Sequence, residues 1–249
     1  MNAPVAVTAP FAGRVAVVTG GSSGIGAQTV RLLGERGATT VVLDLQADPA
    51  QPDEFVCDVG SPTSVAVALE AVRERFGQVD VLVHAAAVAL HKCIPDTSVE
   101  EWSDVLRVNL TGAFTVIRAV LPGMQERGWG RIVTVSSGTA VRVGGGNSAY
   151  AASKAGLIAL TKVTALEGAP HGVTANVVAP GLTDTPMTRA VIGGDEELLA
   201  AARTSGIANP MGVVLRPAEV AEGIVFFCLP EAGRVTGQVL HVSAGSVMP

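Results

Sequence analysis

Short runs of apolar, mostly β-branched residues alternate along the chain with longer stretches whose apolar positions recur at helical spacing. The short runs predict strands at 14–19, 39–44, 54–59, 79–84, 130–136, 173–178 and 238–242. The longer stretches predict helices at 27–36, 61–76, 98–107, 110–127, 150–166, 195–203 and 217–229. The strand runs are continuously apolar instead of alternating, which is typical of strands covered on both faces.

Strands that alternate with helices of this length predict βαβ units, right-handed crossovers and therefore a parallel sheet. We expect an α/β protein whose residues 13–249 form a single Rossmann-type domain, a doubly wound parallel sheet with helices on both faces. Residues 1–12 contain two prolines and no periodic pattern, so we expect a flexible N-terminal tail. Residues 182–215 carry glycines around a short acidic helix, which predicts a lid over a substrate site.

Composition narrows the classes of protein that this chain can belong to. Hydrophobic residues make up 48% of the 249 residues and charged residues only 16%, against about 25% in typical soluble domains. A sheet buried on both faces accounts for these values, and the chain has no charge-free apolar run of about 20 residues that would predict a membrane span. The first residues lack a basic region before an apolar core, so we expect no signal peptide.

Cysteine content points to a cytoplasmic protein, and charge argues against two classes of binding partner. The formal net charge of −5 argues against binding to nucleic acid or to anionic membranes. The three cysteines are widely spaced and are expected to be reduced, mostly buried thiols. No cluster of His, Cys and carboxylate residues has metal-ligand spacing, so we predict no metal site.

A glycine-rich segment, Gly20 to Gly26, lies between the first expected strand and the first expected helix. In that context glycines let the backbone approach a pyrophosphate, and the helix N-terminus supplies N–H donors. Asp44 ends the second expected strand, where a carboxylate would bind the adenosine ribose and repel a 2′-phosphate. The sequence therefore favours NAD(H) over NADP(H), against the alternative of a plain turn with a solvated Asp44.

Tyr150 is the one tyrosine in the chain, and Lys154 follows it four positions later. On a helix these side chains share a face. A neighbouring ammonium group would lower the pKa of the phenol towards neutrality, which would suit Tyr150 to general acid/base catalysis. The alternative is a surface lysine next to a half-buried tyrosine.

The glycine segment that begins at Thr19, together with Asn109, Ser137 and the Tyr150-x-x-x-Lys154 pair, resembles the short-chain dehydrogenase/reductase family over essentially the whole chain, from 14 to 247. The resemblance implies that Tyr150 is the general acid/base and that Lys154 holds the nicotinamide ribose. It implies that Ser137 binds the substrate oxygen and that Asn109 holds a water of the proton relay.

The same resemblance implies the positions that contact NAD(H). Asp58 would contact the adenine amino group, and the Thr183 backbone and Thr185 hydroxyl would hold the carboxamide. The complete expected set is Gly20, Ser22, Ser23, Gly24, Ile25, Gly26, Asp44, Leu45, Asp58, Val59, Ala85, Ala86, Tyr150, Lys154, Pro180, Gly181, Thr183 and Thr185.

The chain departs from the family pattern after the fourth expected strand. The family commonly has Asn-Asn-Ala-Gly or Asn-Ala-Gly there, whereas this chain has His84-Ala85-Ala86-Ala87. The missing Asn removes side-chain hydrogen bonds that brace neighbouring strand ends. His84 would replace that brace or fill space, and we favour space filling.

The expected reaction is the interconversion of a secondary alcohol and a ketone. The substrate is expected to be a medium-sized, mostly apolar small molecule that contacts Ser137, Thr139, Val143, Tyr150 and Leu182. Arg142 or Arg189 would bind an anionic group or be solvated. One alternative is a 3-oxoacyl thioester reductase, which in this family usually uses NADP(H), and another is a non-catalytic NAD(H)-binding module that reports redox state.

The family is frequently tetrameric, so we expect a homotetramer. A stripe of mostly small side chains, Ala152, Gly156, Ala159 and Val163, lies on the helix that bears Tyr150. This stripe would admit the close approach of a second subunit, or it would pack inside the subunit.

Overall fold

The computed structural model describes residues 9–204 and 207–248. Most of the expected tail, residues 1–8, and two residues of the expected lid, 205 and 206, lie outside this part of the chain.

The described residues form a seven-stranded sheet in which every pair of neighbouring strands is parallel. The strand order is β3-β2-β1-β4-β5-β6-β7, so the winding reverses between β1 and β4. The strands are β1 (Val15–Thr19), β2 (Thr39–Asp44), β3 (Glu54–Val56), β4 (Val81–His84), β5 (Gly130–Val135), β6 (Val173–Pro180) and β7 (Val239–Val242). The expected doubly wound α/β fold is confirmed.

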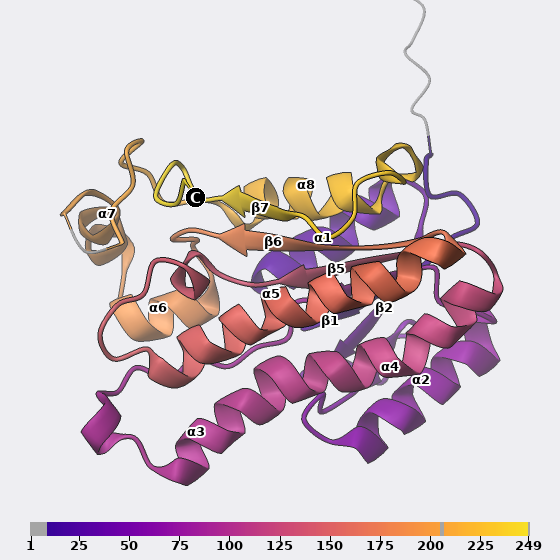
Figure 1. Ribbon diagram of the computed structural model, residues 1–249, viewed down its shortest axis with the longest axis horizontal. Helices are drawn as coiled ribbons and strands as arrows, with labels where there is room; N and C mark the ends of the chain where they lie inside the picture. The colour runs from indigo at the N-terminus through magenta and orange to yellow at the C-terminus, as the bar shows by residue number, and fades with distance from the viewer. Residues whose placement is uncertain (1–8, 205–206, 249) are drawn as a thin grey trace, which may run out of the picture.

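Helices cover both faces of the sheet (Figure 1). One face packs against α2 (Pro62–Phe76), α4 (Gly112–Glu126) and α5 (Ser148–Gly168), and the other packs against α1 (Gly24–Glu35) and α8 (Pro217–Cys228). Successive strand residues point to opposite faces, so Val17 joins the first cluster of buried residues and Val18 joins the second. This explains why the strand sequences are continuously apolar.

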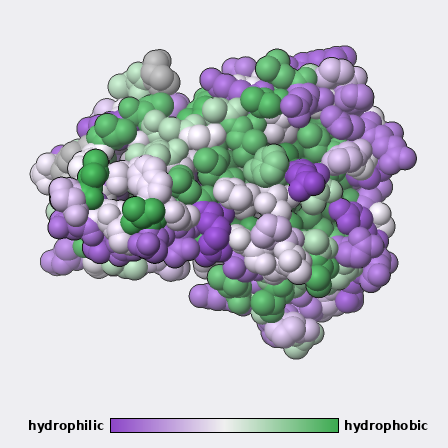
Figure 2. Space-filling model, turned by 60° about the horizontal axis from the view of Figure 1, so that its bottom comes forward, coloured by the Kyte–Doolittle hydropathy of each residue, from purple (hydrophilic) through white to green (hydrophobic). Residues whose placement is uncertain are grey.

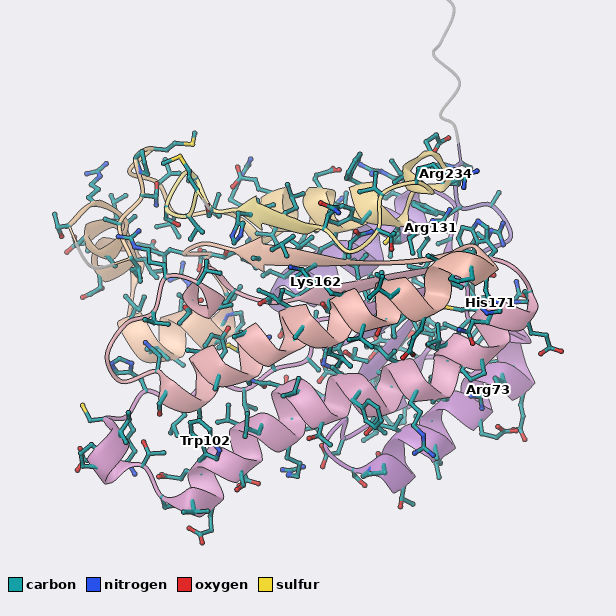
Figure 3. The ribbon with its side chains drawn as sticks, in the orientation of Figure 1. Arg73, Trp102, Arg131, Lys162, His171 and Arg234 are labelled. Carbon is teal, nitrogen blue, oxygen red and sulfur yellow. The ribbon has the colours of Figure 1, made fainter. Side chains whose placement is uncertain are left out.

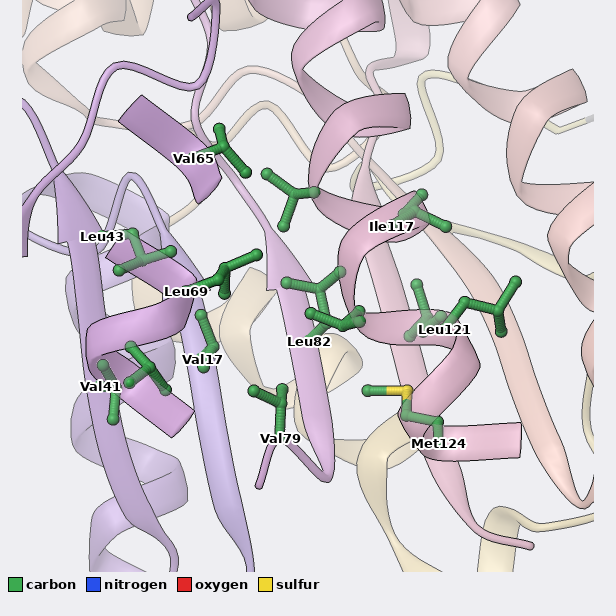
Figure 4. Packing of buried hydrophobic residues seen from close by; sticks show 14 of the residues in the cluster. Val17, Val41, Leu43, Val65, Leu69, Val79, Leu82, Ile117, Leu121 and Met124 are labelled. Atoms are coloured by element: carbon green, nitrogen blue, oxygen red, sulfur yellow. The ribbon is translucent and has the colours of Figure 1, made fainter. Parts of the chain in front are cut away.

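The cluster under α2 and α4 shows how the two layers interlock (Figure 4). Leu43 and Leu82 on the strands meet Leu69 of α2 and Met124 of α4, and all four are buried. Burying a side chain of this size contributes about 1.5–3 kcal/mol. The strands and the helices on this face therefore share one continuous core beneath the loops at the strand ends.

The two helices expected at 98–107 and 110–127 are one continuous helix, so the expected break is wrong. The structure has α3 (Val99–Leu106), a π-helical turn (Arg107–Thr111) and then α4. No proline lies between 99 and 121, and the wider π turn accommodates the change of face without ending the helix. The turn carries Asn109, one of the predicted catalytic residues.

The combined helix Val99–Glu126 is long and apolar enough to cross a membrane by length and composition alone. Its α4 half packs Val116, Ile117 and Val120 into the core under the sheet. A core helix of an α/β domain meets the same criteria, so this helix is weak evidence for a membrane span.

Several other boundaries differ from expectation. Helix α1 begins at Gly24, inside the glycine segment, and β3 ends at Val56 instead of residue 59. The expected acidic helix is present as α7 (Asp195–Thr204), but α6 (Pro186–Ile192) was not expected. Both lie beyond the carboxyl ends of the strands (Figure 1). A small cluster of Leu182, Leu198 and Ala202 packs this region together.

Candidate active site

A cavity of about 710 Å³ lies at the carboxyl ends of the central strands, between the sheet and α6. Carboxyl ends of parallel strands meet at one edge of a sheet, and loops diverge where the winding reverses. Most of the predicted site residues are brought together here: Gly20, Ser23, Gly24, Ile25, Gly26, Asp44, Leu45, Asp58, Val59, Ala85, Ala86, Ser137, Thr139, Tyr150, Lys154, Pro180, Gly181, Leu182, Thr183 and Thr185.

Three predicted residues do not line the cavity. Val143 is a correction, because its side chain is 73% exposed and is directed into solvent from the turn that precedes Tyr150. Ser22 reaches the site only through its backbone N–H, which donates to Asp44. Asn109 is fully buried beneath the cavity wall.

The glycine segment is shaped for close backbone approach. Gly20 has a φ of 69°, and a Cβ there would lie 2.7 Å from the Ala86 backbone nitrogen. A Cβ on Gly26 would overlap the Gly20 carbonyl oxygen. Only glycine fits these positions, and the first turn of α1 is left facing the cavity, as a pyrophosphate site requires.

Asp44 fastens the glycine segment to the end of β2. Its carboxylate accepts hydrogen bonds from the Ser22 N–H at 3.1 Å and from the Gln46 N–H at 2.9 Å. Asp44 forms no ion pair with any Lys or Arg in the described part of the chain. The Asp44 side chain is therefore not ion-paired within the described residues, and it lies beside the glycine segment at the end of the cavity that fits a dinucleotide.

Tyr150 and Ser137 meet in the cavity, but the electrostatics differ from the expectation. The pKa of Tyr150 is raised above its ordinary value, first because burial disfavours the phenolate, and a hydrogen bond with Ser137 acts in the opposite direction. From the sequence, the charge of Lys154 is expected to be the main influence on the pKa of Tyr150 and to lower it. In the structure its Nζ lies over the ring, 5.7 Å from the centroid, and donates to the Val135 carbonyl oxygen.

Lys154 is almost completely buried, with 2% of its surface exposed. Its Nζ donates to the Val135 carbonyl oxygen at 2.8 Å. Burial lowers the pKa of Lys154 from 10.5 to about 8, because the ammonium form is desolvated. Lys154 therefore remains protonated at neutral pH and gives up its charge far more readily than a surface lysine.

Asn109 joins three parts of the active-site wall. Its side-chain oxygen accepts from the Val88 N–H at 2.8 Å, and its amide nitrogen donates to the Val88 carbonyl at 2.9 Å. The same nitrogen donates to the Ser153 hydroxyl at 3.1 Å. Because its side chain is occupied by these bonds, Asn109 clamps the loop after β4 onto the helix of Tyr150.

The remaining predicted cofactor contacts have partners of their own. Asp58 accepts from the Gly60 N–H at 2.8 Å and pairs with Arg107 at 3.5 Å. The Thr185 hydroxyl caps α6 by accepting from the Thr188 N–H at 3.2 Å. These bonds order the two side chains at the cavity edge.

His84 does more than fill space, which corrects our expectation. It is 1% exposed, and its Nδ1 lies 3.0 Å from the Thr19 hydroxyl, which also accepts from the Ala86 N–H at 3.3 Å. His84 thus ties the ends of β1 and β4 together. Its Nε2 is buried and has no hydrogen-bond partner in the described residues.

Burial, assisted by the charge of Lys154, lowers the pKa of His84 from 6.5 to about 3. The unfolded chain therefore binds a proton at His84 between these values while the folded protein does not. The stability that this group contributes is complete above pH 6.5 and is lost as the pH falls towards 3, with a slope of at most about 1.4 kcal/mol per pH unit. We expect His84→Asn to flatten the dependence of unfolding free energy on pH between 6 and 4, measured by urea denaturation.

An unchanged slope in His84→Asn would contradict a buried, neutral His84. His171→Asn is the matched control, since His171 lies at the opposite end of the sheet from α6 and α7 (Figure 3). We expect that substitution to leave the slope as it is in the natural protein.

The two arginines that the sequence offered as anion-binding residues, Arg142 and Arg189, have different environments. Arg189 is paired with Asp184 at 2.6 Å and with Asp195 at 2.7 Å. Arg142 lines the cavity, and its side chain donates hydrogen bonds to backbone carbonyls.

The sequence did not point to the C-terminal residues Ser246 and Val247, which also line the cavity. The one sequence feature that could have indicated Ser246 and Val247 is their position just after the last strand of a parallel sheet.

Comparison with known proteins adds to this geometry. A family model described as enoyl-(acyl carrier protein) reductase matches residues 20–246. The chain is 39% identical to the 3-oxoacyl-[acyl-carrier-protein] reductase FabG of Vibrio cholerae, over 95% of this chain and 98% of the relative. It is 34% identical to the short-chain reductase protein NovJ of Streptomyces niveus, over 93% of each chain.

Solved structures of similar fold include gox2181, with a TM-score of 0.85 and 32% identity over 96% of this chain and 97% of that one. Levodione reductase has a TM-score of 0.84 and 28% identity over 94% of this chain and 97% of that chain.

Proposed function

The chain belongs to the short-chain dehydrogenase/reductase family of oxidoreductases, and we propose that it uses NAD(H) to interconvert a ketone and a secondary alcohol. The observation that carries this proposal is the meeting of Ser137, Tyr150 and Lys154 in one cavity with the glycine segment. The dinucleotide, when bound, supplies or accepts the hydride. The protein supplies the proton and the binding of the substrate oxygen.

In the direction of ketone reduction, Tyr150 donates its phenolic proton to the carbonyl oxygen. The raised pKa of Tyr150 keeps the phenol protonated at neutral pH, which suits it to this donor role. Ser137 donates a hydrogen bond to the same oxygen and stabilises the negative charge that develops on it. Lys154 lies buried beside Tyr150, where its positive charge stabilises the phenolate that remains after the proton is donated. The ammonium group of Lys154 would also bind the nicotinamide ribose hydroxyls.

The relatives named above favour a particular ketone, a 3-oxoacyl thioester. Its 3-oxo group undergoes the same reduction, so this candidate is a narrower form of the proposed reaction. Apolar residues that line the cavity, among them Leu90, Leu182 and Met187, are suited to an acyl chain. We further propose that the region 182–215, with α6 and α7, acts as a lid over this chain.

The proposal is tested by turnover with both dinucleotides. We expect the protein to oxidise NADH faster than NADPH when given acetoacetyl-coenzyme A and a set of simple ketones, because Asp44 repels a 2′-phosphate. Asp44→Asn removes the charge and retains one acceptor oxygen, so the ratio of kcat/KM for NADH to that for NADPH should fall by about tenfold.

The matched control is Asp48→Asn, in the loop that follows β2, whose ratio should stay at the natural value. A natural preference for NADPH would contradict the role given to Asp44. Dinucleotide binding with no turnover on any carbonyl would instead favour a redox-reporting module.

We also propose that the protein is a cytoplasmic homotetramer. Phe114 on α4 and Val163 on α5 are about half exposed, and Leu166 on α5 is more exposed still. Apolar residues cross the middle of the face seen in Figure 2. Gly156 packs inside the subunit, since a Cβ there would lie 2.9 Å from Leu110. The other members of the small-residue stripe, Ala152, Ala159 and Val163, are exposed and are available to a second subunit.

A further inference from the structure

Arg142 lies in the turn that begins at Ser137, close to the reacting groups. Its backbone N–H donates to the Gly138 carbonyl at 2.9 Å. Its side chain lines the cavity, and Nη1 donates to the carbonyl oxygens of Ala208 and Ser246, each at 3.0 Å. These two carbonyls come from the lid region and from the C-terminal segment. The guanidinium group is therefore held in place by the main chain of two separate segments.

These contacts leave the other edge of the guanidinium group available. Nη1 carries two hydrogens and uses both, while Nε and Nη2 carry three more. Neither nitrogen donates a hydrogen bond within the described residues, and Arg142 has no carboxylate within 4.0 Å there. Nε and Nη2 form the planar fork that binds a carboxylate or phosphate with two parallel hydrogen bonds. The fork is pre-positioned, so little side-chain entropy is lost when an anion binds.

The charge of Arg142 is isolated in this part of the cavity. Arg142 and Lys154 are the only Lys or Arg side chains among the described residues that line it, and Lys154 is buried beside Tyr150. The residues around the substrate space are largely apolar, including Leu182, Val191 and Val247. An unpaired, fixed cation at the edge of an apolar space is suited to the charged end of an otherwise apolar ligand.

We propose that Arg142 binds an anionic group of the substrate through its Nε and Nη2 edge, so that the substrate is a ketone with an apolar spacer and a negative charge at its far end. This inference rests on the proposed ketone reduction. The shared chemistry is a carboxylate or phosphate, which either a free keto acid or the phosphopantetheine arm of a thioester provides. Arg142 is exposed, so the anion remains partly hydrated and its binding weakens as salt is added.

The experiment compares substrates that differ only in charge. The first pair is 6-oxoheptanoate and its methyl ester, and the second is acetoacetyl-phosphopantetheine and acetoacetyl-pantetheine. For each pair, the ratio of kcat/KM for the anionic to the neutral member is measured in the natural protein and in Arg142→Met. We expect Arg142→Met to lower the ratio by about tenfold in at least one pair. The pair that responds identifies the source of the anion.

Two further variants separate anion binding from a purely structural role. Arg142→Lys keeps the charge without the fork and should give an intermediate ratio. Arg189→Met removes an arginine of α6 that is already paired with two carboxylates, and it should keep the natural ratio. If Arg142→Met lowers turnover of both members of each pair equally, Arg142 only ties the lid to the C-terminal segment and the proposal is overturned.

A binding measurement separates this proposal from the proposed reaction. Calorimetry in the presence of NAD⁺ compares the affinities of the protein for 6-oxoheptanoate and for its methyl ester. It therefore measures the preference for the anion without requiring turnover. If no ketone is reduced but the natural protein prefers the acid and Arg142→Met does not, the reaction is wrong and the anion site stands. If the natural protein shows no preference for either anion by binding or turnover, the anion site is overturned.

Discussion

Replacing Tyr150 with phenylalanine is expected to lower kcat by about a thousandfold or more, while NADH still binds with nearly unchanged affinity. Phenylalanine keeps the ring that packs beside Lys154 but has no proton to give to the substrate oxygen. General acid catalysis alone contributes about 10²- to 10⁴-fold. The measurement is steady-state NADH oxidation with a ketone substrate, combined with a fluorescence titration of NADH binding.

Ser137→Ala is the companion variant, and its loss should be smaller, about a hundredfold, because it removes one hydrogen-bond donor. Equal loss of NADH binding and turnover in Tyr150→Phe would indicate a collapsed site and would contradict the assigned role. Since Tyr150 is the only tyrosine, an ultraviolet titration reports its pKa directly. Without dinucleotide, that pKa should lie above the value of an exposed tyrosine, because burial disfavours the phenolate.

Replacing Gly26 with alanine is expected to lower the free energy of unfolding by about 3 kcal/mol and to weaken NADH binding at least tenfold. The added Cβ would overlap the Gly20 carbonyl oxygen and lie 3.1 Å from the Gly21 Cα. Both are main-chain atoms of the glycine segment, so the segment itself would have to move. Urea denaturation and NADH titration measure the two effects.

Gly34→Ala is a matched control on the same helix. A Cβ at Gly34 would lie 3.8 Å from the nearest atom outside the helix, Cγ2 of Thr40, which is ordinary contact. Alanine has a higher helix propensity than glycine, so this variant should gain up to about 1 kcal/mol of stability and bind NADH normally. Similar losses in Gly26→Ala and Gly34→Ala would show that α1 tolerates no substitution, and would remove the special role of Gly26.

Much of the cavity could be predicted because its residues lie at positions that local pattern already defines. Gly20, Gly24 and Asp44 follow the ends of buried strands, and parallel strands bring such ends together. The prediction that Val143 contacts the substrate was wrong, because the direction of a side chain in a glycine-rich turn depends on how that turn packs. Ser246 and Val247 were missed for a related reason, since nothing local distinguishes a C-terminal segment that folds back over a cavity.

The sequence by itself determined the strands, most helices, the parallel sheet and the face shared by Tyr150 and Lys154, since these follow from periodicity and from spacing along the chain. Only the tertiary structure decided the electrostatics and the side-chain partners. Burial raises the pKa of Tyr150 against the expected effect of Lys154, and His84 braces Thr19 across two strands. Arg142 is fixed by carbonyls 66 and 104 residues away in the chain. Desolvation and such long-range contacts depend on which segments meet in space, and no local pattern encodes that.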